Sequence, residues 1–197
     1  MSKGDQTRRQ ILDLAVLDAT RVGLEGLSIG LLADRLSMSK SGLFAHFGSK
    51  EALQIAVLDH ASASFVDEVV RPGLRTPRGE ARMRALFDGW LGWGVDSPTR
   101  GGCLFVAASS ELDDQPGPVR DRLADIQRDW LELLASVARA ASLDGKFRPD
   151  LDADGFAQEM MGILLGAHLV SRLITDKDGV PRARAAFERL LADARAR

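Results

Sequence analysis

The sequence has one cysteine, no tyrosine and no asparagine among its 197 residues. A single cysteine, Cys103, excludes an intramolecular disulfide, and no apolar run follows the charged residues 1–10, so we expect no export signal and a reducing environment. The longest apolar stretch, residues 160–170, is interrupted by Gly162 and Gly166 and is shorter than the roughly 18 residues that span a bilayer. The sequence therefore predicts a cytoplasmic protein without a membrane segment.

The sequence also has few groups that carry chemistry. Its histidines, His46, His60 and His168, are far apart, and with one cysteine they form no cluster with the spacing of metal ligands. The segment GGCLF (101–105) lacks the lysine and the preceding strand of a phosphate loop, and SSELDDQ (109–115) has carboxylates without a base or an oxyanion site. We predict no enzymatic activity, no metal and no cofactor.

Neither sign of charge dominates, because the formal net charge is −2. This balance argues against a protein coated with basic residues for nucleic acid or an anionic membrane. Residues 1–51 carry seven Lys or Arg and six Asp or Glu, a net charge of +1 against −3 for the rest of the chain. So small an excess favours a specific, salt-sensitive interaction with nucleic acid over nonspecific coating.

Apolar residues recur with helical spacing along most of the chain, and no strand partner is visible. Residues 5–23 predict a first helix that ends at Gly23, a residue type common at helix C-termini. Ser28 then precedes an apolar pattern over 29–36 that predicts a second helix of only about two turns, with Ser28 as its N-cap. So short a helix forms only when it packs on its neighbours.

A third short helix follows a turn of three residues, SMS. Ser39 is placed to cap this helix and Gly48 to end it, while Leu43, Phe44 and Phe47 form the apolar side by which we expect it to dock. Two short helices joined by a tight turn and supported by a first helix have the arrangement of a helix-turn-helix, whose second helix enters the DNA major groove. The other side of the third helix offers small and cationic residues that let the backbone approach DNA, namely Lys40, Ser41, Gly42, Ala45 and His46.

The rest of the chain predicts longer helices. One begins at Ser49 and is expected to break at Pro72. Residues 156–175 predict a helix that is apolar on more than one side, which should be buried within a core or against another subunit. We therefore predict an all-α protein of about nine helices, with a three-helix helix-turn-helix domain over residues 1–48 and a larger helical bundle over residues 49–197.

Four features at these spacings occur together: the helix ending in Gly23, the capped helix from Ser28, the segment SKSGLFAHF and the junction GSKEAL. Through them, residues 7–58 resemble the DNA-binding domain of TetR-type transcriptional regulators. Residues 101–134 also resemble the regulatory domain of one branch of that family. The resemblance implies a homodimeric, all-helical repressor with an N-terminal domain that reads DNA and a C-terminal domain that dimerises and binds a small effector.

The resemblance also implies which residues contact DNA. Lys50 matches the family lysine at the start of the fourth helix, where an ammonium group and a helix N-terminus can together hold a phosphate. Gly42 and Phe44 stand where Thr and Tyr are frequent, so two hydroxyl donors are missing, and a chain without asparagine cannot read adenine by the bidentate Asn contact. Outside the resemblance, the same lysines would be ordinary solvated charges and the serines plain caps. The candidate DNA-binding residues are Arg8, Arg9, Ser28, Ser39, Lys40, Ser41, Gly42, His46 and Lys50.

Aromatic and sulfur side chains are concentrated in the second part of the chain, where such a set could line an apolar effector pocket. The alternative is that most of them belong to an ordinary core, and His168 is equally compatible with a core position and with a ligand contact. A redox role for Cys103 is the less favoured alternative to a structural one. The candidate pocket residues are Met83, Phe87, Trp90, Trp93, Cys103, Phe105, Trp130, Met161 and His168.

The last two predicted helices carry a signature of self-association. Gly162 and Gly166 are four residues apart and would let a partner helix approach closely, and the last helix offers Phe187, Leu190 and Leu191. We expect these helices from two subunits to form a four-helix interface.

Taken together, the sequence predicts a sequence-specific DNA-binding regulator that represses from a palindromic operator and is released by a small apolar or amphipathic effector. Its expected partners are double-stranded DNA, that effector and a second copy of itself. The alternatives are a helical adaptor that binds another protein and a regulator that needs no effector. Salt-dependent binding to duplex DNA separates the adaptor from the regulators.

Overall fold

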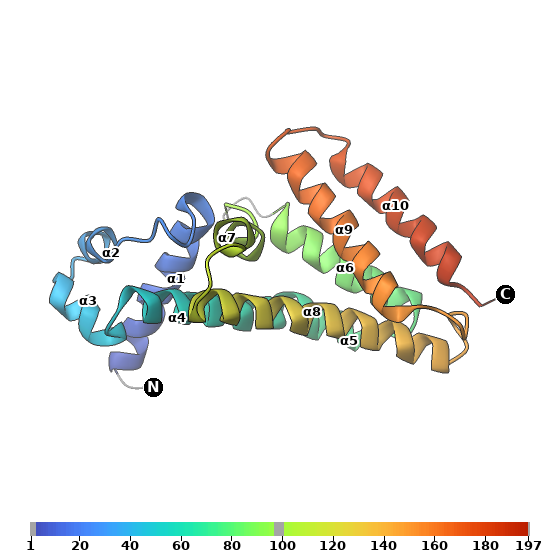
Figure 1. The fold of residues 1–197 in the computed structure, drawn as a ribbon, viewed down its shortest axis with the longest axis horizontal. Helices are drawn as coiled ribbons and strands as arrows, with labels where there is room; N and C mark the ends of the chain where they lie inside the picture. The colour runs from blue at the N-terminus through green and yellow to red at the C-terminus, as the bar shows by residue number, and fades with distance from the viewer. Residues whose placement is uncertain (1–2, 97–100, 197) are drawn as a thin grey trace. The chain divides into compact units, whose positions relative to one another are not determined.

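The computed structural model describes residues 3–96 and 101–196, which fold almost entirely into helices (Figure 1). The elements are α1 (Lys3–Val22), α2 (Ile29–Arg35), α3 (Lys40–Phe47), α4 (Lys50–Phe65), the π-helical segment η1 (Val66–Val70), α5 (Arg71–Arg75), α6 (Glu80–Gly94), α7 (Leu104–Leu112), α8 (Pro118–Leu143), α9 (Ala153–Arg172) and α10 (Gly179–Ala194). The described residues form no strand, and one isolated antiparallel bridge joins Phe147 to Arg195. Because α4, η1 and α5 follow one another without a break, these residues make up nine separate helices, and the predicted all-α fold is confirmed. In the part of the chain that the structure describes, no helix is long and apolar enough to span a bilayer.

The chain forms two compact units. The first contains Met1–Ser64 together with Pro98–Ile126, and the second contains Phe65–Ser97 together with Gln127–Arg197. The long helix α8 contributes its first turns to one unit and its remaining turns to the other. The functional division predicted after residue 48 is a different kind of boundary and stays a prediction.

Helix α1 organises the first unit through one apolar stripe. Ile11, Ala15 and Ala19, spaced four residues apart, are fully buried on this stripe. The helix ends before Gly23, whose φ of +82° is a backbone conformation that glycine adopts without steric cost. Arg35 on α2 donates a hydrogen bond to the buried carboxylate of Asp18 on α1, so that a charge-assisted hydrogen bond ties the helix-turn-helix to its supporting helix.

The caps predicted for the two short helices are confirmed. The Ser28 hydroxyl accepts a hydrogen bond from the Leu31 amide at 3.4 Å, and the Ser39 hydroxyl accepts one from the Gly42 amide at 3.0 Å. These bonds satisfy amide groups that a helix start leaves without an intrahelical partner. The helices α2 and α3 pack against each other, and Leu43 is fully buried.

The predicted break at Pro72 is wrong. The helix that begins with α4 runs on through η1 into α5, and the Arg71 amide donates to the Val66 carbonyl, five residues earlier. Proline in a regular α-helix removes an i to i−4 hydrogen bond and clashes with the carbonyl four residues back. The wider π-helical turn just before Pro72 changes that geometry, so the chain continues as a helix.

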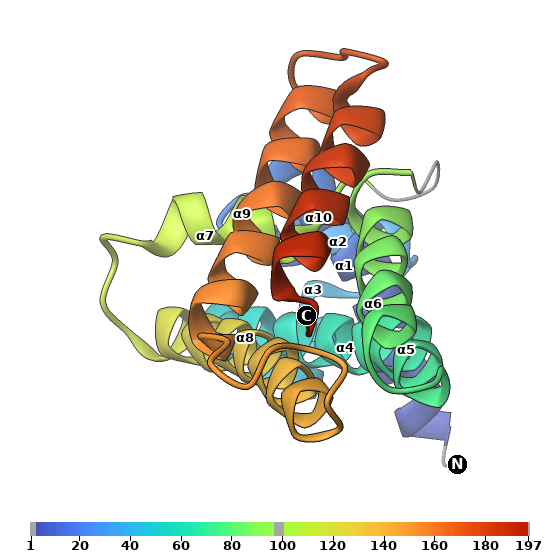
Figure 2. The ribbon, with the colours of Figure 1, turned by 90° about the vertical axis from the view of Figure 1, so that its right-hand side faces the viewer.

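The core of the second unit lies among α6, α9 and α10. Helix α9 packs along α10 (Figure 2) and also contacts α6. The rings of Phe87 on α6 and Phe187 on α10 are stacked with centroids 4.0 Å apart. Charged side chains at the surface also connect α6 to α10 and to the residue that follows it. Glu80 accepts hydrogen bonds from Arg84 and Arg195, and Arg84 also donates to Glu188.

Candidate nucleic-acid interface

Helix α3 presents one continuous exposed face. Leu43 anchors the helix from below, whereas Lys40, Ser41, Phe44 and Ala45 are all exposed. An α-helix advances about 100° per residue, so residues 40, 41, 44 and 45 fall within about 140° of one another on the helix circumference. These four residues are called the exposed face of α3 below.

The composition of this face corrects the sequence analysis at one position. Phe44 is 49% exposed and lies between Lys40 and Ala45, so its prediction as a docking residue is wrong. The helical period could have revealed this error, because position 44 lies only about 40° from Lys40 on the helix circumference. His46 is half-buried, about 120° from Lys40 in the other direction, with its ring centroid 6.3 Å from that of Phe47, and its contact with DNA stays a prediction.

The side chain of Lys40 lies across the start of α2. A Cβ atom built on Gly30 would be 3.1 Å from its Cε atom, so glycine gives the lysine stem room to pass. Ser28 and Gly30 on one helix and Lys40 on the other are therefore close together. Ser28, Ser39 and Ser41 are exposed, and the Ser41 hydroxyl lies 3.2 Å from that of Ser39, while Gly42 is half-buried.

Arg8 is already engaged within the chain. Its guanidinium donates to the His46 carbonyl at 2.6 Å and lies 4.4 Å from the centre of the Phe47 ring. A cation over an aromatic face is a stabilising arrangement, so Arg8 ties α1 to the end of α3. Arg9, next to it, is exposed.

Lys50 begins α4 and meets a residue that the sequence analysis missed. Its ammonium donates to the Glu25 carbonyl oxygen at 2.6 Å and lies 3.4 Å from the Glu25 carboxylate. The Gln54 amide group donates to the Leu24 carbonyl at 3.1 Å and to the Glu25 carboxylate at 2.8 Å. The turn between α1 and α2 is thus held by two side chains of α4. No periodic pattern in the sequence marks Glu25, because it lies in a turn.

The predicted pocket residues fall into both compact units. Cys103 and Phe105 belong to the first, and the other seven belong to the second. Phe87, stacked on Phe187, is a core residue. In the first unit both predicted residues, Cys103 and Phe105, are buried. In the second unit Met161 and His168 are half-buried, and the other predicted residues are buried, namely Met83, Phe87, Trp90, Trp93 and Trp130.

Four residues of the predicted set have further ring contacts within the second unit. Phe65 meets Trp93 and Trp130 edge to face, with centroids 5.4 Å and 5.1 Å away. The indole Nε1 of Trp130 is buried, and none of the described residues accepts a hydrogen bond from it. The His168 ring lies 6.4 Å from that of Trp90, and burial, together with the charge of Arg172, lowers the pKa of this histidine. Trp130 therefore contributes a fully buried N–H donor without an acceptor among the described residues.

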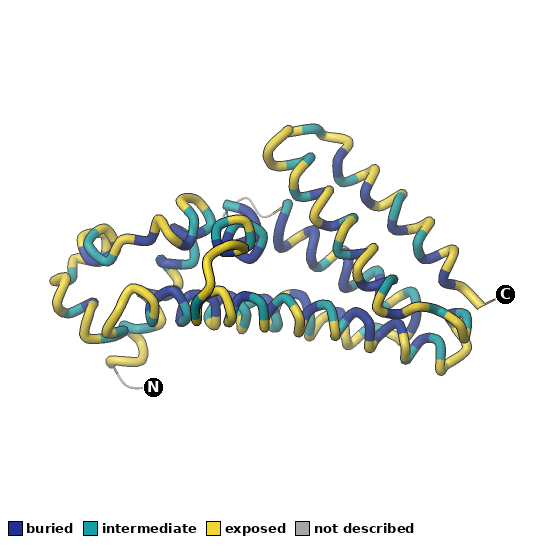
Figure 3. Tube along the Cα trace, viewed as in Figure 1, coloured by how far each residue is buried: buried dark blue, intermediate teal, exposed yellow. Residues whose placement is uncertain are grey.

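Helix α9 and the residue that follows it expose one apolar face, made of Gly162, Leu165, Gly166, Leu169 and Leu173. Buried and exposed residues alternate along this helix (Figure 3). A Cβ atom on either glycine would meet nothing within 4 Å, so neither glycine is needed for packing inside the chain. By contrast, Phe187 and Leu191 on α10 are 1% and 0% exposed, and the prediction that they face a partner is wrong. They pack inside their own unit. Leu190 is half-buried and lines a surface cleft with Phe156 and Asp193.

No metal site is built by the part of the chain that the structure describes, since no group of three or more His, Cys, Asp or Glu side chains is placed to hold an ion.

Comparison with known proteins places this geometry in a family. Residues 79–187, more than half of the chain, match the profile of the tetracyclin repressor-like C-terminal domain, and residues 11–57 match the profile of bacterial regulatory proteins of the tetR family. The chain belongs to the TetR family. As a TetR-family protein, it is a DNA-binding transcriptional regulator.

Solved structures of TetR-family regulators share this fold. One from Cytophaga hutchinsonii is 22% identical and has a TM-score of 0.89, covering 100% of this chain and 98% of its own. One from Chloroflexus aurantiacus is 24% identical with a TM-score of 0.87, covering all of both chains. AibR, solved in complex with isovaleryl coenzyme A and operator DNA, is 20% identical with a TM-score of 0.71, covering 96% of this chain and 98% of its own. A comparison with curated protein sequences found no match.

Proposed function

We propose that this TetR-family regulator is a homodimeric repressor that binds a palindromic operator through the exposed face of α3 and is released by a small effector. The observation that carries the proposal is the exposed face itself. It combines a cation, a hydroxyl, an aromatic ring and a small residue on a helix that is anchored from its other side by the buried Leu43. Such a face is suited to a DNA major groove, because it offers donors for phosphates and apolar groups for base edges.

Each residue of the face has a proposed role. Lys40 donates to a phosphate or to the acceptor edge of guanine, and Ser41 donates to a nearby phosphate. Phe44 contacts thymine methyl groups, the apolar feature that the major groove offers. Ala45 lets the helix approach closely. Lys50 and the exposed Arg9 hold the flanking phosphates.

The exposed face of α9 supports the homodimer. Glycine at positions 162 and 166 leaves the backbone accessible, and Leu169 and Leu173 are 51% and 77% exposed. A stripe of leucines and glycines facing water is costly unless another apolar surface covers it, and a second copy of α9 would cover it symmetrically. In such a dimer the two α3 helices would read half-sites about 34–36 Å apart, one helical turn of DNA.

The aromatic side chains of the second unit support the effector. Trp93 and Trp130 both pack edge to face against Phe65 in an apolar core, and the Trp130 indole N–H is a buried donor without an acceptor among the described residues. An apolar molecule carrying one hydrogen-bond acceptor would satisfy it. An effector that prefers one dimer geometry lowers operator affinity by its differential affinity for the two states. AibR, which was solved with both an acyl coenzyme A and operator DNA, is a relative of the same fold.

Capture of genomic DNA fragments by the purified protein tests this function. At low salt the wild-type protein should enrich fragments that share a palindromic site, and enrichment should fall steeply as salt is raised. The Lys40→Ala variant should lose this enrichment. Lys177→Ala, which removes the same charge from an exposed position on the α9–α10 connection, should keep it. No enriched site at any salt concentration, after unfolding and refolding to remove a co-purified effector, would contradict the proposal.

A further inference from the structure

Helix α7 reaches the turn that joins α1 to α2. The Glu111 carboxylate, at the end of α7, accepts a hydrogen bond from the Glu25 amide at 2.9 Å. The same carboxylate lies directly over Gly23, where a Cβ atom would be only 2.2 Å from Oε1. Gly23 therefore meets two demands, because its positive φ ends α1 and its missing side chain admits Glu111.

The segment that leads into α7 is docked on α1 as well. The Gly101 amide donates to the Thr20 hydroxyl at 3.1 Å, and a Cβ atom on Gly101 would lie 2.5 Å from the Thr20 carbonyl oxygen. Both ends of the stretch from Gly101 to Glu111 thus contact the last turn of α1 and the residues that follow it. A shift of α7 would therefore disturb these contacts with the turn.

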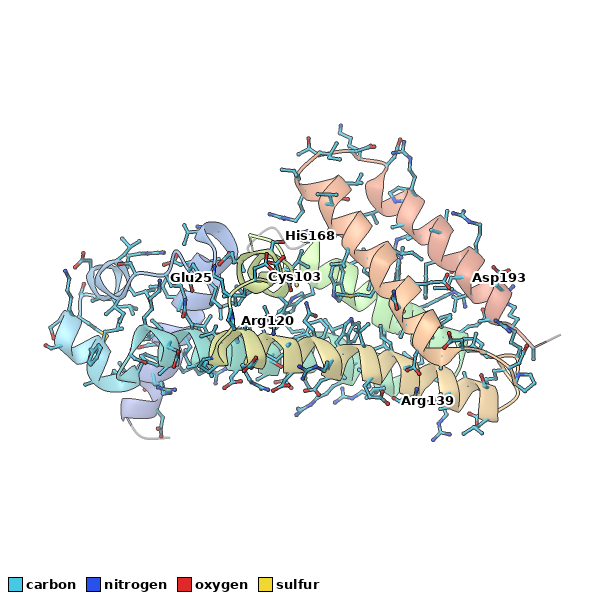
Figure 4. The ribbon with its side chains drawn as sticks, viewed as in Figure 1. Glu25, Cys103, Arg120, Arg139, His168 and Asp193 are labelled. Atoms are coloured by element: carbon cyan, nitrogen blue, oxygen red, sulfur yellow. The ribbon has the colours of Figure 1, made fainter. Side chains whose placement is uncertain are left out.

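The turn connects α7 to Lys50 through one residue. The Glu25 amide donates a hydrogen bond to Glu111, and the Glu25 carbonyl and one carboxylate oxygen accept hydrogen bonds from Lys50 (Figure 4 labels Glu25). The other carboxylate oxygen accepts a hydrogen bond from Gln54. The side chains of Lys50 and Glu25 are 46% and 47% exposed, so the ammonium is accessible to a DNA phosphate. A carboxylate at 3.4 Å and an incoming phosphate would compete for the same cation.

We propose that Glu25 is a built-in competitor of operator phosphate for Lys50, and that Glu111 on α7 positions it. The inference rests on the proposed DNA-binding function. With the turn fixed by Glu111, the Glu25 carboxylate stays beside Lys50 and weakens its hold on the phosphate. When α7 moves away, the turn loosens, Lys50 is released and phosphate binding strengthens. Glu25 and Glu111 are positioning residues that act through Lys50.

A double-mutant cycle on operator affinity tests the proposal. Glu25→Gln should raise affinity about two- to fivefold per half-site, the size expected for a solvent-exposed ion pair. The salt dependence should steepen by up to about 0.9 in the slope of log K against log salt for each Lys50 that gains a full phosphate contact. In the Lys50→Ala background, Glu25→Gln should change affinity little. Glu111→Ala, which removes the acceptor of the Glu25 amide, should raise affinity less than Glu25→Gln does, and should have no further effect when combined with it.

The matched control is Glu51→Gln, which removes a carboxylate next to Lys50 from an exposed position on α4. An equal rise in affinity for Glu51→Gln, or the same rise for Glu25→Gln with and without Lys50, would overturn the proposal, since either result would mean that only general charge repulsion had been removed. These outcomes require a wild-type protein that binds its operator. A wild type that binds no DNA fragment would instead contradict the proposed function.

Discussion

Helices α3 and α9 both expose residues that the chain itself does not use, but the two surfaces differ in kind. The exposed face of α3 is mixed, because it carries both the charged Lys40 and the aromatic Phe44. The face formed by residues 162–173 is apolar, and a Cβ atom built on either of its two glycines would meet nothing within 4 Å. A mixed face fits a polyanion with apolar patches in its groove, whereas an apolar face with bare backbone fits another helix. The difference assigns the two surfaces to different proposed partners.

The largest expected effect comes from charging the α9 face. Leu169→Asp with Leu173→Asp would place carboxylates in the proposed dimer interface, at a cost of about 3–5 kcal/mol for each uncompensated buried charge. Sedimentation should then show a monomer where the wild type is a dimer, and operator affinity should fall with it. The thermal stability of the monomer should be unchanged, because both positions are exposed within the chain. A variant that remains dimeric would place the interface elsewhere.

Phe187→Ala tests whether Phe187 on the neighbouring helix α10 belongs to the core and not to an exposed surface. Phe187 is buried against Phe87, so its truncation should lower the free energy of unfolding by about 3–5 kcal/mol. Denaturant unfolding measures this loss. The exposed neighbour Arg189 is the matched position, and Arg189→Ala should cost less than about 0.5 kcal/mol. Equal, small losses for the two variants would contradict the core assignment of Phe187.

Lys40→Ala should weaken operator binding without lowering the stability of the fold, the opposite of the effect expected for Phe187→Ala. Losing one good contact to a base edge or phosphate should weaken operator binding by about 1–3 kcal/mol, roughly five- to 150-fold. The melting temperature should not change, since Lys40 is exposed on α3. Fluorescence anisotropy with a labelled operator and a thermal melt measure the two quantities. Loss of folding instead of binding would mean that Lys40 supports the helix-turn-helix itself.

The smallest effect concerns the ion pairs between α6 and α10. Hydrogen bonds from Arg195 and Arg84 lower the pKa of Glu80 from 4.5 to about 2. The stabilisation is therefore complete above pH 4.5 and is lost as the pH falls towards 2, by an amount on the order of 1 kcal/mol for an accessible pair. Melts at pH 5 and pH 3 should show a smaller loss of stability for Glu80→Gln than for the wild type. An identical loss in both proteins would show that Glu80 does not contribute.

Much of the α3 region could be predicted from local sequence. Ser28 and Ser39 predict the starts of α2 and α3, and Gly23 predicts the end of α1. These predictions are possible because a helix cap depends on only a few neighbouring residues. The helical period also predicts that Phe44 lies on the same side as Lys40. The general tendency of aromatic side chains to be buried predicts the opposite, and it does not hold at this position.

Contacts between distant residues could not be predicted in this way. Glu25 and Glu111 are 86 residues apart, and neither belongs to a periodic pattern that points to the other. On α9 and α10 the apolar stripes predict that these residues are buried. They do not indicate whether the covering surface belongs to the same chain or to a second copy. Leu169 and Phe187 look alike in the sequence and differ only in the folded chain.

The central claim is that the exposed face of α3 reads DNA, and two substitutions on this helix test it most directly. Operator affinity should be measured for Phe44→Ala and His46→Ala, on the captured site and on the same site with its thymines replaced by uracil, which lacks the methyl group. We expect Phe44→Ala to weaken binding by about 1 kcal/mol on the thymine site and to have little effect on the uracil site, while His46→Ala changes neither. Weaker binding for His46→Ala, with Phe44→Ala unchanged, would contradict the account and return the groove-facing side to the residues first predicted from the sequence.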